Sequence, residues 1–298
     1  MEPRATSHPQ SALRPTDDEI DLFGLTHQGH RRASNQDHFL IATIHAEIKV
    51  KGTSLTDVTE LPLLGNRLGT VLLVADGVGG TNDGGAAARL ATESVMQYVA
   101  SSLRSYHEMG IGNDPRFLTG LREAAVRAHD VVVAEAAARA DHPSLATTLT
   151  LGIGVWPWLY VVQVGDSRAY IYTGGRLVQV TRDQTMAQEM LDIGALAPAD
   201  ASRSPLKDIL SSAIGAEQAT PEVSRVDVSE RGCVLIFCTD GLTKHVTNAE
   251  IEAYCAKGLS AEKLVRSLVD LALERGGSDN VTVVVAQAPL KARGGAAT

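Results

Sequence analysis

The chain has few cysteines, few aromatic side chains and no excess of positive charge. Its 298 residues include 3 cysteines and 4% aromatic residues, and the formal net charge is −8. Nucleic-acid binding relies on an excess of Lys and Arg near phosphates, so this balance argues against a nucleic-acid partner. The cysteines, Cys233, Cys238 and Cys255, lack the spacing of a zinc site, and we interpret them as buried free thiols of a reducing compartment.

Long apolar runs are also missing. No stretch approaches the ~20 apolar residues that a membrane-spanning helix requires, and residues 1–20 lack the apolar core of a signal peptide. We therefore expect a cytoplasmic protein that makes no membrane contact. Apolar residues make up 44% and charged residues 21% of the chain, a composition typical of a globular protein with a substantial core.

The apolar residues predict strands and helices that do not alternate regularly. Strands are predicted at 21–26, 38–44, 147–155, 159–164, 168–172, 177–180, 222–228, 234–239 and 281–286. Helices are predicted at 86–104, 116–140, 186–191, 248–255 and 261–274. Closely spaced strands with short turns pair antiparallel, so we expect an α+β fold in which antiparallel sheets are covered by helices.

The other segments are arranged around a single domain. Residues 1–20 are rich in Pro, Ser, Thr and charge and are expected to form a flexible leader, and residues 289–298 a loose tail. Residues 21–288 would then form one domain. Within it, residues 45–68 are expected to form a local hairpin or insertion, and residues 184–215 a mobile surface subdomain.

Two apolar strands end in an Asp-Gly pair. One covers residues 72–77 (LLVADG) and is followed by two further glycines, and the other covers residues 235–241 (LIFCTDG). An acid at the end of a strand, beside glycines, suits a bound cation or a phosphate. A nucleotide phosphate loop needs GxxxxGK[ST] and a dinucleotide loop needs GxGxxG, and neither pattern follows Asp76. The cation site is therefore the better interpretation.

Five aspartates lie at strand ends or in glycine-rich turns: Asp37, Asp76, Asp166, Asp240 and Asp279. Packed sheets bring their strand ends to a common edge, so we expect several of these acids to converge. Converged carboxylates repel one another unless they are protonated or bridged by cations. An all-oxygen set suits Mg²⁺ or Mn²⁺, and the Gly77 carbonyl could be a further ligand.

An arginine pair precedes the first of these acids. Arg31 and Arg32 lie close to Asp37 in the sequence. The planar fork of an arginine matches two phosphate oxygens, so an arginine beside a metal cluster is a natural partner for a substrate phosphate. Metal ions, water and arginine together predict hydrolysis of a phosphate ester.

Six short motifs occur in a recognisable order: residues 32–37 (RASNQD), 76–80 (DGVGG), 146–149 (ATTL), 165–168 (GDSR), 239–242 (TDGL) and 279–282 (DNVT). Together they resemble the metal-dependent Ser/Thr protein phosphatase family (type 2C) in its bacterial form, over residues 22–287. The resemblance implies a central antiparallel β-sandwich flanked by helical layers (α-β-β-α). It also equates residues 184–215 with the family's variable flap.

The resemblance also implies a role for each matching residue. Asp76 would bridge two Mg²⁺ or Mn²⁺ ions, the Gly77 carbonyl would bind one of them, and Asp240 and Asp279 would bind the other. Asp37, with Gln36, would hold metal-bound waters, and Asp166, with Asp240, would form a third, weaker metal site. Arg32, and not Arg31, would bind the substrate phosphate.

The implied reaction is hydrolysis of phosphoserine and phosphothreonine in proteins, the substrates of a cognate Ser/Thr kinase. The expected catalytic residues are Arg32, Asp37 and Asp76, and the water would be activated by the metal ions. No Cys or His motif suggests a covalent phosphoenzyme. Two alternatives stay open: a catalytically weak member that acts as a regulatory or binding module, and a hydrolase of small phosphate esters.

The chain departs from the family pattern at three places in or beside its motifs, and residues 47–68 have no clear counterpart in that pattern. Val78 stands where animal members carry a histidine that could protonate the leaving group, and Gln36 replaces an acid found in many relatives. Lys244 and His245 follow the second Asp-Gly pair, where relatives often have an acid. These departures leave the source of the leaving-group proton open, with His245 as one candidate.

Overall fold

The computed structural model describes residues 14–47, 64–79, 83–102, 115–139, 144–201 and 203–288. Two five-stranded sheets form its centre. One sheet has the strand order β1 (Asp21–His27), β12 (Val281–Gln287), β11 (Val234–Cys238), β8 (Arg168–Thr173) and β9 (Arg176–Gln179). The other has the order β10 (Glu222–Asp227), β7 (Trp158–Val164), β6 (Leu149–Val155), β3 (Leu64–Ala75) and β2 (His38–Glu47).

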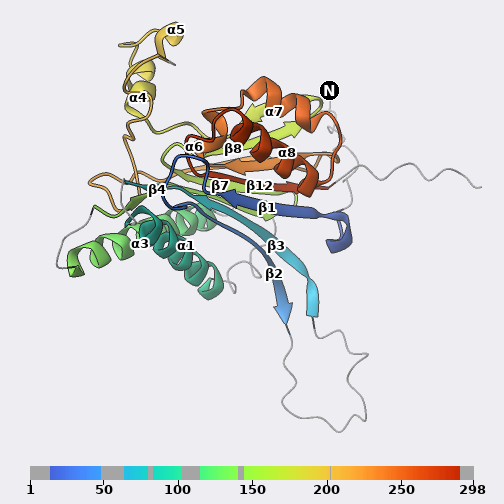
Figure 1. Cartoon of the computed structure of the whole chain (residues 1–298). Helices are drawn as coiled ribbons and strands as arrows, with labels where there is room; N and C mark the ends of the chain where they lie inside the picture. Colours follow the sequence, from blue (N-terminus) through green and yellow to red (C-terminus); the bar gives the residue numbers. More distant parts are fainter. Residues whose placement is uncertain are drawn as a thin grey trace, which may run out of the picture.

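Helices cover the outer face of each sheet (Figure 1). Helices α1 (Asp83–Ser101) and α3 (Pro115–Ala138) pack on β2, β3, β7 and β10, whereas α7 (Asn248–Cys255) and α8 (Ala261–Glu274) pack on β1, β9 and β12. Every strand pair within the two sheets is antiparallel. The predicted α+β sandwich with flanking helical layers is therefore confirmed.

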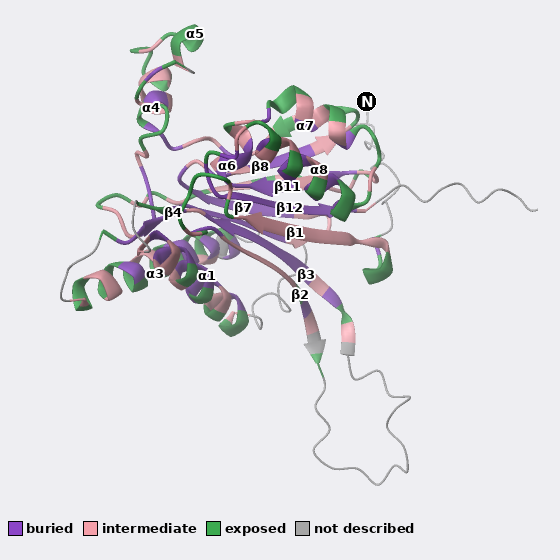
Figure 2. Ribbon diagram, in the orientation of Figure 1, coloured by how far each residue is buried: buried purple, intermediate pink, exposed green. Residues whose placement is uncertain are grey.

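Three apolar clusters hold these layers together. The cluster between the two sheets includes Leu72 and Val74 of β3, Phe237 of β11 and Val284 of β12. These strands are among the buried segments in Figure 2. A Cβ atom on Gly152 would lie 2.3 Å from Cζ of Phe237, so the sheets approach closely only because β6 carries a glycine there.

The expected aspartates lie where strands begin or end. Asp76 follows β3, Asp240 follows β11 at the start of the short helix α6 (Asp240–Thr243), and Asp279 precedes β12. Asp37 precedes β2, and Asp166 lies in the turn between β7 and β8. The sandwich thus brings five separate chain segments toward one edge, as the strand-end argument predicted.

The segment ahead of the first strand differs in part from the expected flexible leader. Residues 17–19 form a 3-10 helix, η1 (Asp17–Glu19), and Pro15 is buried. The buried Arg67 of β3 donates a hydrogen bond to the Pro15 carbonyl at 2.9 Å and pairs with Asp17 at 3.0 Å. A buried guanidinium requires such partners, and it thereby holds residues 14–20 against the sandwich. Residues 1–13 lie outside the described part.

The flap contains two short helices, α4 (Met186–Asp192) and α5 (Pro198–Ala201), and it projects away from the sandwich in Figure 1. Of the expected insertion at 45–68, residues 48–63 lie outside the described part, as do the tail at 289–298 and the predicted helix ends at 103–104 and 140. No helix in the described ranges is long and apolar enough to cross a membrane.

Candidate active site

A cavity of about 230 Å³ lies at the edge where the aspartates meet. Its lining includes four of the five predicted acids: Asp76, Asp166, Asp240 and Asp279. It also includes Arg32, the predicted phosphate ligand, Gly77, the predicted carbonyl ligand, and Asp208, an acid of the flap. Asp37 does not line this cavity and is buried beside it, whereas Arg31 is exposed and takes no part in the lining. The structure therefore brings together the residues that the motifs singled out.

Asp76 is fixed through its own backbone. Its N–H donates to Thr148 Oγ1 at 3.0 Å, and its carbonyl accepts from Thr147 Oγ1 at 2.8 Å and from the Thr148 N–H at 2.9 Å. A Cβ atom on Gly77 would lie 2.3 Å from the backbone carbon of Gly84 in α1, so only glycine allows the strand end to approach this helix. These contacts explain why the second motif requires the Asp-Gly pair and the third requires threonines.

Asp37 is held by two threonines. Its Oδ2 accepts hydrogen bonds from Thr239 Oγ1 at 2.8 Å and from Thr282 Oγ1 at 2.6 Å. Its Oδ1 is buried and has no hydrogen-bond partner. Burial raises the pKa of Asp37 to about 7 despite these two bonds. A buried carboxylate oxygen without a partner is the form of site that a bound cation satisfies.

The other acids repel one another. Burial, followed by the charge of Asp37, raises the pKa of Asp76 well above its usual value, and burial followed by the charge of Asp240 raises the pKa of Asp166 to about 7. Burial also raises the pKa of Asp240, although Lys244 opposes the shift, and Asp240 Oδ1 has no partner. In the described part of the chain, no Lys or Arg forms an ion pair with Asp37, Asp76 or Asp166.

Asp279 has the opposite electrostatics, because two cations contact it. Arg32 donates to Asp279 from Nε at 2.6 Å and from Nη2 at 2.8 Å. Lys244 Nζ lies 2.7 Å from Asp279 Oδ2 and 2.5 Å from Asp240 Oδ2. Burial raises the pKa of Asp279, but the hydrogen bonds from Arg32 and Lys244 outweigh it and lower this pKa below its usual value.

The donor set fits hard divalent cations. All the candidate ligands are oxygens, which Mg²⁺ and Mn²⁺ prefer, and two carboxylate oxygens are buried without partners. Still, no group of three His, Cys, Asp or Glu side chains in the described ranges is arranged as a finished metal cage. The oxygens of Asp240 and Asp279 contact the ammonium of Lys244.

Several site residues were missed or misjudged in the sequence. The threonines that hold Asp37 belong to the motifs TDGL and DNVT, so their positions beside the acids were the available signal. Asp208 comes from the flap, and no sequence pattern indicated that it would reach the cavity. His245 does not line the cavity, and its Nε2 accepts from the Ser278 N–H at 3.1 Å, so the suggestion of His245 as the proton donor is not supported.

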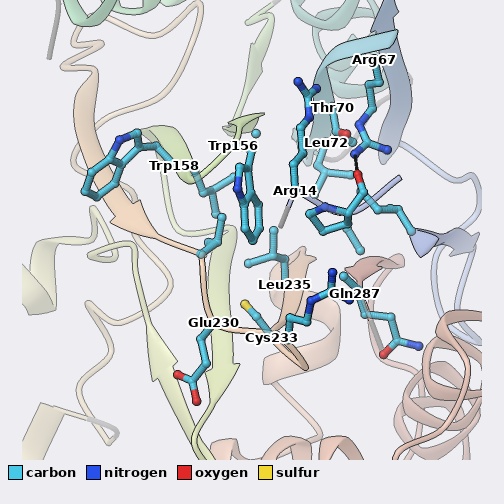
Figure 3. Close-up of a pocket in the computed structure, with 18 residues that line it drawn as sticks. Arg14, Arg67, Thr70, Leu72, Trp156, Trp158, Glu230, Cys233, Leu235 and Gln287 are labelled. Atoms are coloured by element: carbon cyan, nitrogen blue, oxygen red, sulfur yellow. Dashed lines mark hydrogen bonds between the residues drawn. The ribbon is translucent and has the colours of Figure 1, made fainter. Parts of the chain in front are cut away.

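A second cavity, of about 90 Å³, lies between the two sheets beneath residues 14–20 (Figure 3). Its walls include Leu72, Leu235 and Trp156, and Arg14 and Arg67 lie side by side at one end. None of the predicted site residues lines it. This second cavity therefore contains none of the candidate catalytic or metal-binding residues.

Comparisons with known proteins agree with this geometry. A family model described as Protein phosphatase 2C matches residues 49–272. The serine/threonine protein phosphatase PstP of Mycobacterium tuberculosis is 32% identical over 217 residues, covering 72% of this chain and 40% of PstP. The serine/threonine phosphatase stp of Listeria welshimeri is 28% identical over 224 residues, covering 75% of this chain and 86% of stp.

A solved structure gives the same result for the fold. The catalytic domain of PstP, in complex with 2 manganese ions, superposes with a TM-score of 0.68 at 26% identity, over 91% of this chain and 99% of that one. The chain thus spans less than half of full-length PstP but nearly all of its catalytic domain. The family match over most of the sequence and the shared fold establish that this chain belongs to the protein phosphatase 2C family.

Proposed function

We propose that this chain is a metal-dependent phosphoprotein phosphatase that hydrolyses phosphoserine and phosphothreonine. The observation that carries the proposal is the convergence of Asp76, Asp166, Asp240 and Asp279 with Arg32 around one cavity. Family membership and the named activities of PstP and stp support it.

The site residues take the following roles in this proposal. Asp37, Asp76, Asp166, Asp240, Asp279 and the Gly77 carbonyl hold two or three Mg²⁺ or Mn²⁺ ions, which, when bound, supply an activated water and neutralise phosphate charge. The manganese in the PstP structure supports this choice of metal. Thr239 and Thr282 fix the Asp37 carboxylate, and Thr147 and Thr148 fix the backbone of Asp76.

Arg32 binds the phosphate of the substrate. Its side chain is 46% exposed and lines the cavity, so it can reach both Asp279 and an incoming anion. Its fork orients a phosphate through two oxygens and withdraws charge from them. Val78 also lines the cavity, but its aliphatic side chain has no acidic proton, so it cannot protonate the leaving alkoxide.

The substrates are phosphorylated proteins, those of a cognate Ser/Thr kinase, in the cytoplasm. A groove of about 310 Å³ adjoins the cavity and is lined by flap residues such as Gln188 and Lys207, which gives an extended peptide a surface on which to lie. This arrangement favours a phosphoprotein over a small phosphate ester, and the two can be separated experimentally.

The experiment measures phosphate release from phosphothreonine, phosphoserine and phosphotyrosine peptides and from p-nitrophenyl phosphate, with Mn²⁺, with Mg²⁺ and with a chelator. We expect metal-dependent hydrolysis of the first two peptides. Activity that survives chelation would refute the metal mechanism, a preference for phosphotyrosine or for p-nitrophenyl phosphate would refute the substrate class, and inactivity on all substrates would favour a regulatory module.

A further inference from the structure

Lys244 contacts two acids of the carboxylate cluster. It follows the short helix α6 as its C-cap, and its N–H donates to the Asp240 carbonyl at 2.8 Å. This turn directs the side chain back over Asp240, and Nζ comes to 2.5 Å from Asp240 Oδ2 and 2.7 Å from Asp279 Oδ2. One ammonium therefore bridges two acids that belong to different segments of the chain.

The bridge divides the cluster into two halves of different charge. Asp240 and Asp279 contact Lys244, and Asp279 also contacts Arg32. By contrast, in the described part of the chain neither Asp76 nor Asp166 is ion-paired with a side chain. A cation entering between Asp76 and its neighbours meets repelling carboxylates that it can neutralise, whereas a cation entering between Asp240 and Asp279 meets a position already held by positive charge.

We propose that Lys244 is an internal counter-cation that competes with a divalent ion for Asp240 and Asp279. This inference rests on the proposed function, since it concerns the same metal site. The ion that uses these two carboxylates binds only when it displaces the ammonium, so this position fills at a higher metal concentration than the position formed by Asp76 and the Gly77 carbonyl. Lys244 is a positioning residue in this scheme, because it acts on the site through the ion that it excludes.

The surroundings of Lys244 give the displaced side chain a place to go. Lys244 lines both the aspartate cavity and the adjoining groove, and Asp208 of the flap lines both as well. Asp208 is exposed, with 58% of its side chain accessible, and it pairs with Lys207 at 3.8 Å. An ammonium that leaves Asp240 and Asp279 would therefore still lie in a cavity lined by a carboxylate, which lowers the cost of its displacement.

The test compares Mn²⁺ binding to the full chain, the Lys244→Met variant and a Lys207→Met control by isothermal titration calorimetry without substrate. Methionine keeps the length of the side chain and removes its charge. Lys207 lines the same groove but forms no ion pair with Asp240 or Asp279, so its variant controls for the loss of one positive charge. We expect the Mn²⁺ ion of lower affinity to bind at least tenfold tighter to Lys244→Met than to the parent. Its affinity for Lys207→Met should equal that of the parent. Unchanged or weaker binding to Lys244→Met would overturn the proposal.

Thermal unfolding separates this role from a purely structural one. Without metal, Lys244→Met should melt at a lower temperature than the parent, because Asp240 and Asp279 each lose a cationic partner. With saturating Mn²⁺ the difference should vanish or reverse, because the ion takes the place of the ammonium. An equal loss with and without Mn²⁺ would mean that Lys244 only supports the fold. Should Lys244→Met fail to fold, Lys244→Gln serves in the same comparison. Both readouts use no phosphorylated substrate, so they stand or fail independently of the phosphatase assay.

Discussion

Arg32 and Asp279 form a two-pronged ion pair, with Nε and Nη2 of the guanidinium at 2.6 and 2.8 Å from the carboxylate oxygens. The two residues are 247 positions apart in the chain. One is the proposed phosphate ligand and the other a proposed metal ligand, so the pair links the first motif of the sequence directly to the last. Asp279 thereby holds Arg32 at the cavity before a substrate arrives.

Arg32→Lys is expected to lower kcat/KM on a phosphothreonine peptide by roughly 10²-fold, the usual cost of losing an oriented charge-stabilising donor. Lysine keeps the charge but cannot offer two parallel N–H groups to a phosphate. Steady-state kinetics at saturating Mn²⁺ provide the measurement. Arg31→Lys is the matched control, because Arg31 is exposed and does not line the cavity. Equal effects of the two substitutions would contradict the assignment of Arg32.

Thr282→Val is expected to destabilise the protein by about 1–3 kcal/mol, because it removes one of the two donors to the buried Asp37 carboxylate. Valine has nearly the same shape, so packing changes little. Urea unfolding of the metal-free protein measures the loss, and Thr282→Ser, which restores the hydroxyl, should recover most of it. A valine variant as stable as the parent would show that the bond at 2.6 Å contributes little.

The strand-end acids and the layered fold were predictable from the sequence for a physical reason. The apolar run of residues 71–75 is buried as a strand, and the acid that follows it falls at the end of that strand, so the position of Asp76 at the edge of the sheet follows from the apolar pattern. The side-chain partners did not follow in the same way. The contact of Lys244 with Asp279 depends on the turn at the end of α6. The contact of Arg67 with Pro15 depends on the packing of residues 14–20 against β3. Such tertiary contacts leave no periodic pattern in the sequence.

Metal-free protein is expected to lose stability as the pH rises from about 4 to about 7. Burial raises the pKa of Asp37 and of Asp166 to about 7 in the folded chain, against about 3.9 for an unfolded aspartate. Within this window the folded state therefore binds more protons than the unfolded state. The free energy of unfolding falls as the pH rises and these groups ionise. Asp279 has a lowered pKa, so its contribution to stability is lost only as the pH falls below the range of an unfolded aspartate. Melting temperatures of metal-stripped protein across this range test the sign, and Mn²⁺ should flatten the curve. A rise in stability toward neutral pH would contradict the repulsion among these carboxylates.

Gly152→Ala is expected to cost about 1–3 kcal/mol of stability without altering the metal site. The added Cβ would lie 2.3 Å from Cζ of Phe237, in the apolar layer between the sheets. Denaturant unfolding gives the loss, and Mn²⁺ titration of the folded variant should match the parent. Gly174→Ala is the comparison, since a Cβ atom there would meet nothing within 4 Å. The φ of +56° at this position would strain the backbone of the alanine variant, so the comparison sets a demanding reference. A Gly152 variant no less stable than Gly174→Ala would contradict the tight packing at Phe237.

The most direct test of the central claim is phosphate release from a phosphothreonine peptide by the parent chain and by Asp76→Asn, each with Mn²⁺ and with a chelator. Asp130→Asn, an exposed position on α3, is the matched control. We expect Mn²⁺-dependent hydrolysis by the parent and by Asp130→Asn, and a loss of at least 10²-fold in Asp76→Asn, the scale on which removal of a charge-stabilising group acts. Full Mn²⁺-dependent activity in Asp76→Asn would contradict a role for Asp76 as a metal ligand in catalysis.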